Sequence, residues 1–149
     1  MCSGFAPAAF CCYKIADDVR GNVYTDRHRP DNPLYHMQFG LMFPFAISAG
    51  TFGIARGAVD AAYAHIVGRV STQGTKSRTD PFTMAALARA EADVEAGMAH
   101  IKQLVAEHHE WVSAGRGHIS VEDRLRFRID QVRATDRAVE AVGELYRLM

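Results

Sequence analysis

Two arginines flank a short polar loop whose composition suits an anion. Arg69 and Arg78 lie at its ends, and a guanidinium offers a planar fork of donors that matches phosphate and stays charged. The hydroxyl and amide side chains in and beside the loop are those of Ser71, Thr72, Gln73, Thr75, Ser77 and Thr79. The residues alone leave two interpretations open, an ordinary surface loop and a phosphate site.

A second polar group has the side chains that bind metal ions. His100, His108 and His109 stand close to Glu107 and Glu110 in the sequence. Carboxylate-bridged di-iron bundles require a Glu-x-x-His motif on each of two helices. The chain contains neither that motif nor His-x-x-x-His. We therefore predict no metal site and expect polar or interfacial residues near a helix end.

No catalytic residue can be assigned from a local motif. The chain has no G-x-S-x-G, no P-loop and no G-x-G-x-x-G. Acidic residues among the arginines of the last segment fit ion pairs three or four positions apart on a helix rather than a general acid and base. The expected pairs are Arg126 with Asp130, and Arg133 and Arg137 with Asp136 and Glu140.

Composition indicates one globular domain. The chain has 149 residues, 48% of them hydrophobic and 23% charged, with 17 basic and 17 acidic side chains. This balance argues against a nucleic-acid partner, which usually selects a basic face. The three cysteines, Cys2, Cys11 and Cys12, indicate free thiols in a reducing cytosol rather than a disulfide framework.

Nothing in the chain predicts a targeting segment or a membrane span. The N-terminal stretch is mildly apolar but lacks a cationic start. The apolar stretch Phe39–Ile54 contains Pro44 and is shorter than the roughly 20 residues that cross a bilayer. We expect a cytoplasmic protein with no membrane partner.

The elements that must position these residues are nearly all helical. Residues 1–38 read as an irregular N-terminal segment, with at most a short strand near Val19–Thr25, and residues 39–149 as a helical bundle domain. The first helix is predicted over about Leu41–Val70, where apolar residues recur at helical spacing. Its start, Leu41–Ile47, is apolar on every side and predicts burial all round. Its core positions are Ala55, Ala58/Val59, Ala62, Ile66 and Val70.

Two further helices have clear boundary signals. Asp80 can cap the second, with Pro81 at its first position, and glycines at 115 and 117 allow it to end. Ser120 and Asp123 form a capping box that begins the third. The second helix has two heptad lines, Leu87, Val94, Ile101 and His108, and Ala90, Gly97, Leu104 and Trp111. The predicted apolar face of the third contains Val121, Leu125, Ile129, Val132, Val139, Val142 and Tyr146.

These elements predict an all-α, up-down bundle of three long helices, in effect an incomplete four-helix bundle. Each helix would be roughly 40–50 Å long at 1.5 Å per residue. Three such helices leave a long groove that a fourth helix or another subunit must fill. Small residues of the first helix are expected to allow close approach by neighbouring helices: Gly50, Gly53, Ala55, Gly57, Ala58, Ala61 and Ala62.

The order of these features resembles a known family. The stretch GIARGAVDAAYAHIVGR is similar to the first long helix of the C-terminal domain in the acyl-CoA dehydrogenase superfamily. The matching positions are Gly53, Ala55, Arg56, Asp60, Tyr63, Ala64 and Arg69. The segments RPDNPLYHMQF, DPFTMAALARAEADVEAGMAHI and RLRFRIDQVRATDRAVEAVGELYRL resemble the flavin-dependent hydroxylase branch. The resemblance covers roughly residues 27–149.

The resemblance implies a C-terminal four-helix bundle that follows a helical domain and a β domain, so residues 1–38 would be the exit from the β domain. Such proteins form homo-oligomers, usually tetramers, and hold FAD or FMN between domains, partly against a neighbouring subunit. In the hydroxylase branch a separate reductase supplies the reduced flavin. Arg69 matches the arginine that approaches the flavin phosphate in relatives, and Arg78 is a second candidate by its loop position.

Departures from the family limit what carries over. The dehydrogenases' Arg-x-x-Phe-Gly is replaced by Arg69-Val-Ser-Thr-Gln, which places this chain closer to the hydroxylases. The family's catalytic residues have no counterpart here, so the chain is expected to be a truncated member that is inactive alone and binds little or no flavin. The alternatives are a non-catalytic helical oligomerisation module and an acyl-CoA dehydrogenase fragment.

Overall fold

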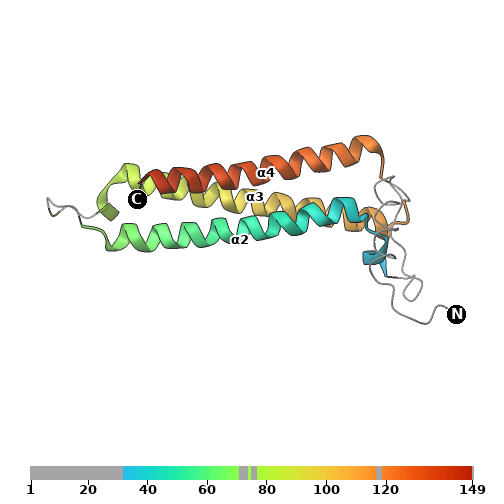
Figure 1. Cartoon of the computed structure of the whole chain (residues 1–149), viewed down its shortest axis with the longest axis horizontal. Helices are drawn as coiled ribbons and strands as arrows, with labels where there is room; N and C mark the ends of the chain where they lie inside the picture. Colours follow the sequence, from blue (N-terminus) through green and yellow to red (C-terminus); the bar gives the residue numbers. More distant parts are fainter. Residues whose placement is uncertain (1–31, 71–73, 75–76, 117–118, 149) are drawn as a thin grey trace, which may run out of the picture.

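The computed structural model describes residues 32–70, 74, 77–116 and 119–148 (Figure 1). Within these residues every regular element is a helix, so the all-α prediction is confirmed. The 3-10 turns are η1 (Pro33–His36) and η2 (Ser77–Thr79), and the long helices are α2 (Phe39–Gly68), α3 (Pro81–Ser113) and α4 (Val121–Leu148). Val19–Thr25 and the three cysteines lie outside the described residues, and the domain division at residue 38 remains a prediction.

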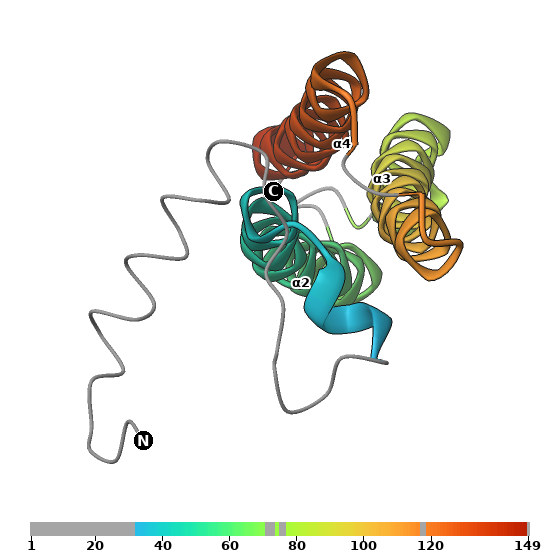
Figure 2. The same cartoon turned by 90° about the vertical axis from the view of Figure 1, so that its right-hand side faces the viewer.

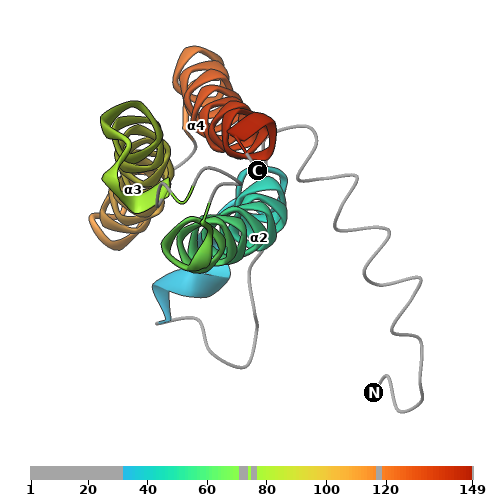
Figure 3. The same ribbon diagram turned by 90° about the vertical axis from the view of Figure 1, so that its left-hand side faces the viewer.

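The three long helices form an up-down bundle. In Figure 1, α2 and α4 run in the same direction and α3 runs in the opposite direction. End-on views place the helices at the corners of a triangle (Figures 2 and 3). Each pair of helices is in contact. The three-helix architecture is therefore as predicted.

Capping side chains begin α3 and α4, and a glycine follows the end of α3, at the positions that the sequence predicts. Asp80 accepts hydrogen bonds from the N–H groups of Phe82 and Thr83 at 3.3 and 3.1 Å, and from the Thr83 hydroxyl. These bonds lower the pKa of Asp80. The Ser120 hydroxyl accepts from the Asp123 N–H at 3.0 Å and donates to its carboxylate at 2.7 Å. Gly115, with φ of 64°, follows the end of α3.

Both predicted heptad lines of α3 face the core. Leu87, Val94, Ile101 and His108 are buried on one line; Ala90, Gly97 and Leu104 are buried on the other, and Trp111 is half-buried. On α2, the predicted positions Ala55, Val59, Ala62 and Ile66 are buried as well. Val70 is exposed, because α2 ends at Gly68, before it.

Among the described glycines, the one packed tightly against neighbouring helices lies on α3 and not on α2. A Cβ on Gly97 would lie 2.7 Å from Phe52 Cε1 and 3.1 Å from the Ala134 carbonyl oxygen. A Cβ on Gly50, Gly53 or Gly57 would have no neighbour within 4 Å. The prediction for the α2 glycines is therefore wrong within this chain, because they lie on the exposed side of α2.

The predicted apolar face of α4 does not form the core of this chain, except that Val142 is partly buried and packs against it. Its large apolar residues Val121, Leu125, Ile129, Val132, Val139 and Tyr146 are exposed. The buried positions are instead Phe127, Gln131, Ala134, Ala138, Ala141 and Leu145. Because alanines allow helix backbones to approach closely, the side of α4 that carries the alanines packs inward. The side that carries the larger apolar residues is left exposed. The start of α2 differs likewise, since Phe43 and Ile47 are exposed.

Ion pairs connect α3 to its neighbours. Arg126 pairs with Glu107 of α3 and lies 3.9 Å from Asp130, as predicted. Arg137 pairs at 3.1 Å with Asp93 of α3 rather than with an acid of its own helix. Arg56 of α2 contacts three carboxylates, those of Asp60, Glu91 and Glu95. All of these groups are partly exposed and are screened by solvent, so each pair contributes little to stability.

Candidate functional site

The backbone segments that carry the two arginines predicted to hold an anion lie close together at the base of one loop. Arg69 directly follows α2 as its C-cap residue, and Arg78 lies in η2. The Ser77 N–H donates a hydrogen bond to the Arg69 carbonyl oxygen at 3.1 Å, which ties the two ends of the loop together. Both arginine side chains are exposed. The fold therefore brings together residues that are nine positions apart in the sequence.

The chemistry available at this end of the bundle is that of guanidinium groups. The N-terminus of α3 would itself attract an anion, but Asp80 already accepts hydrogen bonds from its first N–H groups. A phosphate at this loop would thus be held by Arg69 and Arg78. Of the six hydroxyl and amide residues, Ser77 and Thr79 are described, and Ser71, Thr72, Gln73 and Thr75 lie outside the described residues.

The histidine cluster does not form a metal centre among the described residues. His108 is fully buried, and neither of its ring nitrogens has a hydrogen-bond partner among the described residues. Its ring lies 6.0 Å from that of Phe127. Burial, and secondarily the neighbouring His109, lowers the pKa of His108 to about 4. Glu107 pairs with Arg126, and no group of three or more potential ligands occurs in the described part of the chain.

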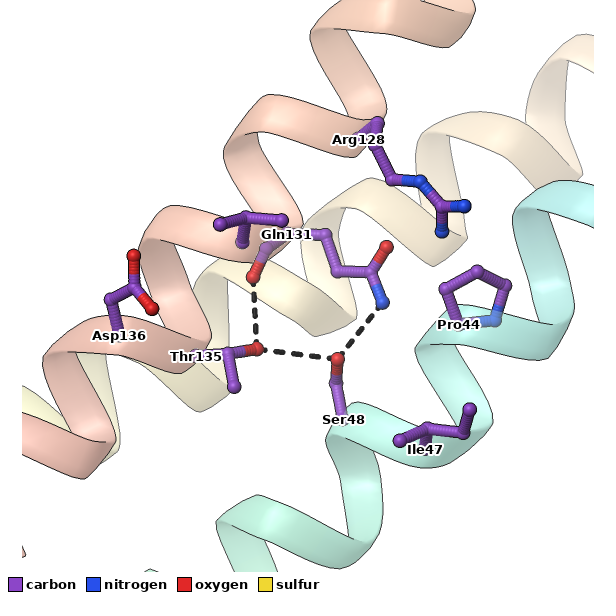
Figure 4. A pocket seen from close by; sticks show the side chains of 8 residues that line it. Pro44, Ile47, Ser48, Arg128, Gln131, Thr135 and Asp136 are labelled. Atoms are coloured by element: carbon purple, nitrogen blue, oxygen red, sulfur yellow. Dashed lines mark hydrogen bonds between the residues drawn. The ribbon is translucent and has the colours of Figure 1, made fainter.

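A cleft of about 340 Å³ opens between α2 and α4 (Figure 4). Ser48 and Gln131, which are only 4% and 6% exposed, form its polar floor with Thr135. Apolar walls and two charged groups complete the lining: Pro44, Ile47, Val132, Arg128 and Asp136. A second cleft of about 130 Å³ is lined by Thr51, Ile54, Ala55, Ala138, Val139 and Val142.

The hydrogen bonds on the cleft floor link Gln131, Ser48 and Thr135. The Thr135 hydroxyl donates to the Gln131 carbonyl oxygen at 2.9 Å, so it can only accept in its 3.3 Å contact with Ser48. Ser48 therefore donates to Thr135, and it accepts from Gln131 Nε2 at 2.9 Å. Turning the Gln131 amide over would take up the Ser48 hydrogen and leave the contact with Thr135 without a donor. The network thus fixes Gln131 and connects α2 to α4.

Sequence reasoning missed this cleft. Gln131 lies on the same helical stripe as the buried residues Phe127, Ala134 and Ala138. A polar side chain at such a position needs an internal partner. That signal was available, but the partner, Ser48, is 83 residues away on another helix.

Comparison with known proteins identifies the family. The profile described as "Acyl-CoA dehydrogenase, C-terminal domain" matches residues 45–149. These residues include all of α3 and α4 and most of α2. The chain belongs to this family.

Within the acyl-CoA dehydrogenase family, its relatives include oxygenase subunits of flavin-dependent monooxygenases. The oxygenase subunit HsaA of a flavin-dependent monooxygenase from Rhodococcus jostii (strain RHA1) is 38% identical over 116 residues, which are 76% of this chain and 30% of that protein. A pigment production hydroxylase of Rhodococcus erythropolis is 32% identical over 130 residues, 87% of this chain and 33% of that protein.

Comparison with solved structures gives the same family. The crystal structure of 3-HSA hydroxylase from Rhodococcus sp. RHA1 superposes with a TM-score of 0.69 at 37% identity, over 80% of this chain and 31% of that one. The resemblance to the hydroxylase branch of the acyl-CoA dehydrogenase family is thus confirmed. The chain spans about a third of the length of the relatives it matches.

Proposed function

We propose that this chain provides the C-terminal helical part of a flavin-dependent monooxygenase and that Arg69 and Arg78 contact the flavin phosphate. The observation that carries the proposal is the hydrogen bond between Ser77 and Arg69, which brings both arginines to one loop base in a chain whose relatives are flavin-dependent. Either FMN or FAD offers the phosphate group that a guanidinium binds well. The intact family's flavin supplies the redox chemistry.

The residues of this chain bind and orient rather than react. Arg69 and Arg78 are exposed, and the described residues beside them offer no apolar enclosure for a flavin ring. The cleft at Ser48 is about 30 Å from Arg69 along α2, at 1.5 Å per residue, so it is not part of the phosphate site. We infer that the chain forms one wall of a flavin site and has no monooxygenase activity alone.

Arg69→Ala is expected to weaken binding of FMN at least tenfold, because one charge-assisted hydrogen-bonding group contributes about 1.5–3 kcal/mol. Equilibrium dialysis of FMN against an assembly in which this chain is reconstituted with the remaining domains of a related monooxygenase measures the effect. Riboflavin, which lacks the phosphate, should bind equally to both proteins. The matched control is Arg89→Ala, because Arg89 is also exposed but lies on α3, away from the loop.

Two results would contradict the phosphate role. One is equal FMN affinity of the wild type and the Arg69→Ala variant. The other is an equal loss of riboflavin binding, which would show that the substitution damages the fold or the ring site instead.

A non-catalytic helical association module is the second candidate function. It is favoured by the exposed apolar stripe of α4. We propose that the chain self-associates as a dimer or tetramer in either case, whereas only the flavin role calls for a reductase as partner. An acyl-CoA dehydrogenase fragment is less well supported, because the chain lacks Arg-x-x-Phe-Gly.

Helix α2 is long and apolar enough, from Gly40 to Gly68, to cross a membrane by length and composition, with a mean hydropathy of 1.2 over its best window. The core helix of a soluble protein meets the same criteria. Since α2 packs along both α3 and α4, we propose a cytoplasmic location without a membrane or nucleic-acid partner.

A further inference from the structure

In the part of the chain that the structure describes, the buried side-chain nitrogens without a hydrogen-bond partner all lie at one end of the bundle. They are Nδ1 and Nε2 of His108 and Nε of Arg124. His108 lies in the last two turns of α3, and Arg124 lies in the first turn of α4. This end is opposite the loop that joins α2 to α3 (Figure 1). Because a buried polar atom without a partner costs free energy, the packing is least favourable here.

His108 and Phe127 form the last layer in which α3 and α4 both bury a side chain. His108 is the last buried residue of α3, and Phe127 is the first buried residue of α4. Their rings lie 6.0 Å apart. Beyond this layer α3 continues only to Ser113, and α4 begins at Val121. We call His108, Arg124 and Phe127 the end layer. Its two helix ends can separate without disturbing the packing further along the bundle.

No carboxylate of the described residues is placed to stabilise a positive charge on His108. Glu107 pairs with Arg126 instead, and Asp123 accepts a hydrogen bond from Ser120. Residues 39–55 of α2 contain no Asp, Glu, Lys, Arg or His. Further charged or titratable groups on the adjoining elements are His109 and Glu110 of α3, Arg124 of α4, Arg116 beyond α3, and His36 of η1, which contacts α3. A proton on the buried ring would therefore have no partner.

The proton affinity of His108 depends on whether the end layer is closed. Burial, and secondarily His109, lowers the pKa of His108 to about 4 in the closed bundle. An exposed imidazole has a pKa of about 6.5. An open end therefore takes up the proton first as the pH falls. Opening is unaffected by pH above about 6.5 and is favoured progressively between that value and about 4.

We propose that the end layer is an acid-sensitive switch, in which uptake of a proton by His108 separates the end of α3 from the start of α4 while the rest of the bundle stays packed. His108 is the only buried titratable residue among the described residues, since the other buried polar side chains are Gln38, Ser48 and Gln131. Acid therefore acts on the core at this end. The proposal does not depend on the flavin role.

Native-state hydrogen exchange at pH 7 and pH 5, corrected for intrinsic exchange rates, tests the proposal. From the two pKa values of His108, the opening equilibrium constant rises about 20-fold between these pH values. We expect amides of residues 108–113 and 124–127 to lose protection by about that factor. Their exchange should depend weakly on low concentrations of urea, as a local opening does, whereas amides near Val94 and Ala138 should exchange only through urea-sensitive unfolding.

Variants separate His108 from other groups that titrate. His108→Leu and His108→Gln both remove the proton site, and in either one exchange at this end should be the same at both pH values. His109→Leu is the matched control, because His109 is a half-buried histidine on the same turn of α3. It should keep the acid response.

Trp111 provides a second readout, because it is the only tryptophan in the sequence and lies three residues from His108. Quenching of its fluorescence by acrylamide should increase from pH 7 to pH 5 in the wild type and in His109→Leu. It should not increase in His108→Leu.

Three results would overturn the proposal. Exchange at this end that does not change between pH 7 and pH 5 would show that opening does not expose His108 to protons. The same steep urea dependence at this end and near Val94 would show that the end opens only when the whole bundle unfolds. An acid response that persists in both His108 variants would assign the effect to the surface carboxylates.

Discussion

Gly97→Val lowers the free energy of unfolding by about 3 kcal/mol, because overpacking a tight core forces side chains and backbone to shift. The new Cβ would lie 2.7 and 2.9 Å from atoms of the Phe52 ring, and 3.1 Å from the Ala134 carbonyl oxygen. The ring can turn, but the carbonyl belongs to the backbone of α4. Urea unfolding followed by circular dichroism measures the loss.

The control for this variant is the same substitution at Gly53, where a Cβ has no neighbour within 4 Å. Gly53→Val should change stability by less than about 1 kcal/mol, since only helix propensity is altered. Phe52→Ala alone should cost about 3–5 kcal/mol as a large-to-small core change. Combined with Gly97→Val it should cost at least about 1 kcal/mol less than the sum, because the ring that clashes is gone. Equal effects at Gly97 and Gly53, or strict additivity with Phe52→Ala, would show that the three helices are not packed as described.

Acid is expected to destabilise the bundle through His108. Its pKa is about 4 in the folded chain and about 6.5 in an unfolded one. The unfolded state therefore binds the proton first as the pH falls. The stabilisation is complete above pH 6.5 and is lost as the pH falls toward 4, by about 3 kcal/mol in total. The physical cause is burial beside Phe127, where neither ring nitrogen has a hydrogen-bond partner in the part of the chain that the structure describes.

His108→Leu should remove this component and leave stability at pH 7 equal or higher, because a buried unpaired polar group is replaced by an apolar one of similar size. Urea midpoints of the wild type and the variant at pH 7 and pH 4.5 give the difference directly, and carboxylates that also titrate cancel in the comparison. His65→Leu, at an exposed position on α2, is the control. If the two proteins lose stability in parallel on acidification, His108 does not carry the acid sensitivity.

The candidate phosphate site shows how much of a binding site can be predicted from local sequence. Arg69 and Arg78 could be proposed because guanidinium chemistry and a polar loop are local features. Their meeting at one loop base depends on the bond between Ser77 and Arg69, which composition does not reveal. The cleft residues Ser48 and Gln131 could not be paired from the sequence, because each looks like an isolated polar residue on its own helix.

Sequence alone determined the helices and their ends. Asp80, Ser120 and Gly115 act on backbone groups a few residues away, so their effect can be read locally, and the heptad lines of α3 are determined by helical periodicity. Only the tertiary structure decided which side of α2 and α4 faces inward, because each of these helices has two sides apolar enough to pack. On α4 the side that carries the alanines packs inward, because small side chains permit a closer approach of the helices, and Gly97 has the same effect on α3. The larger apolar residues, which hydrophobicity alone would place in the core, are left exposed.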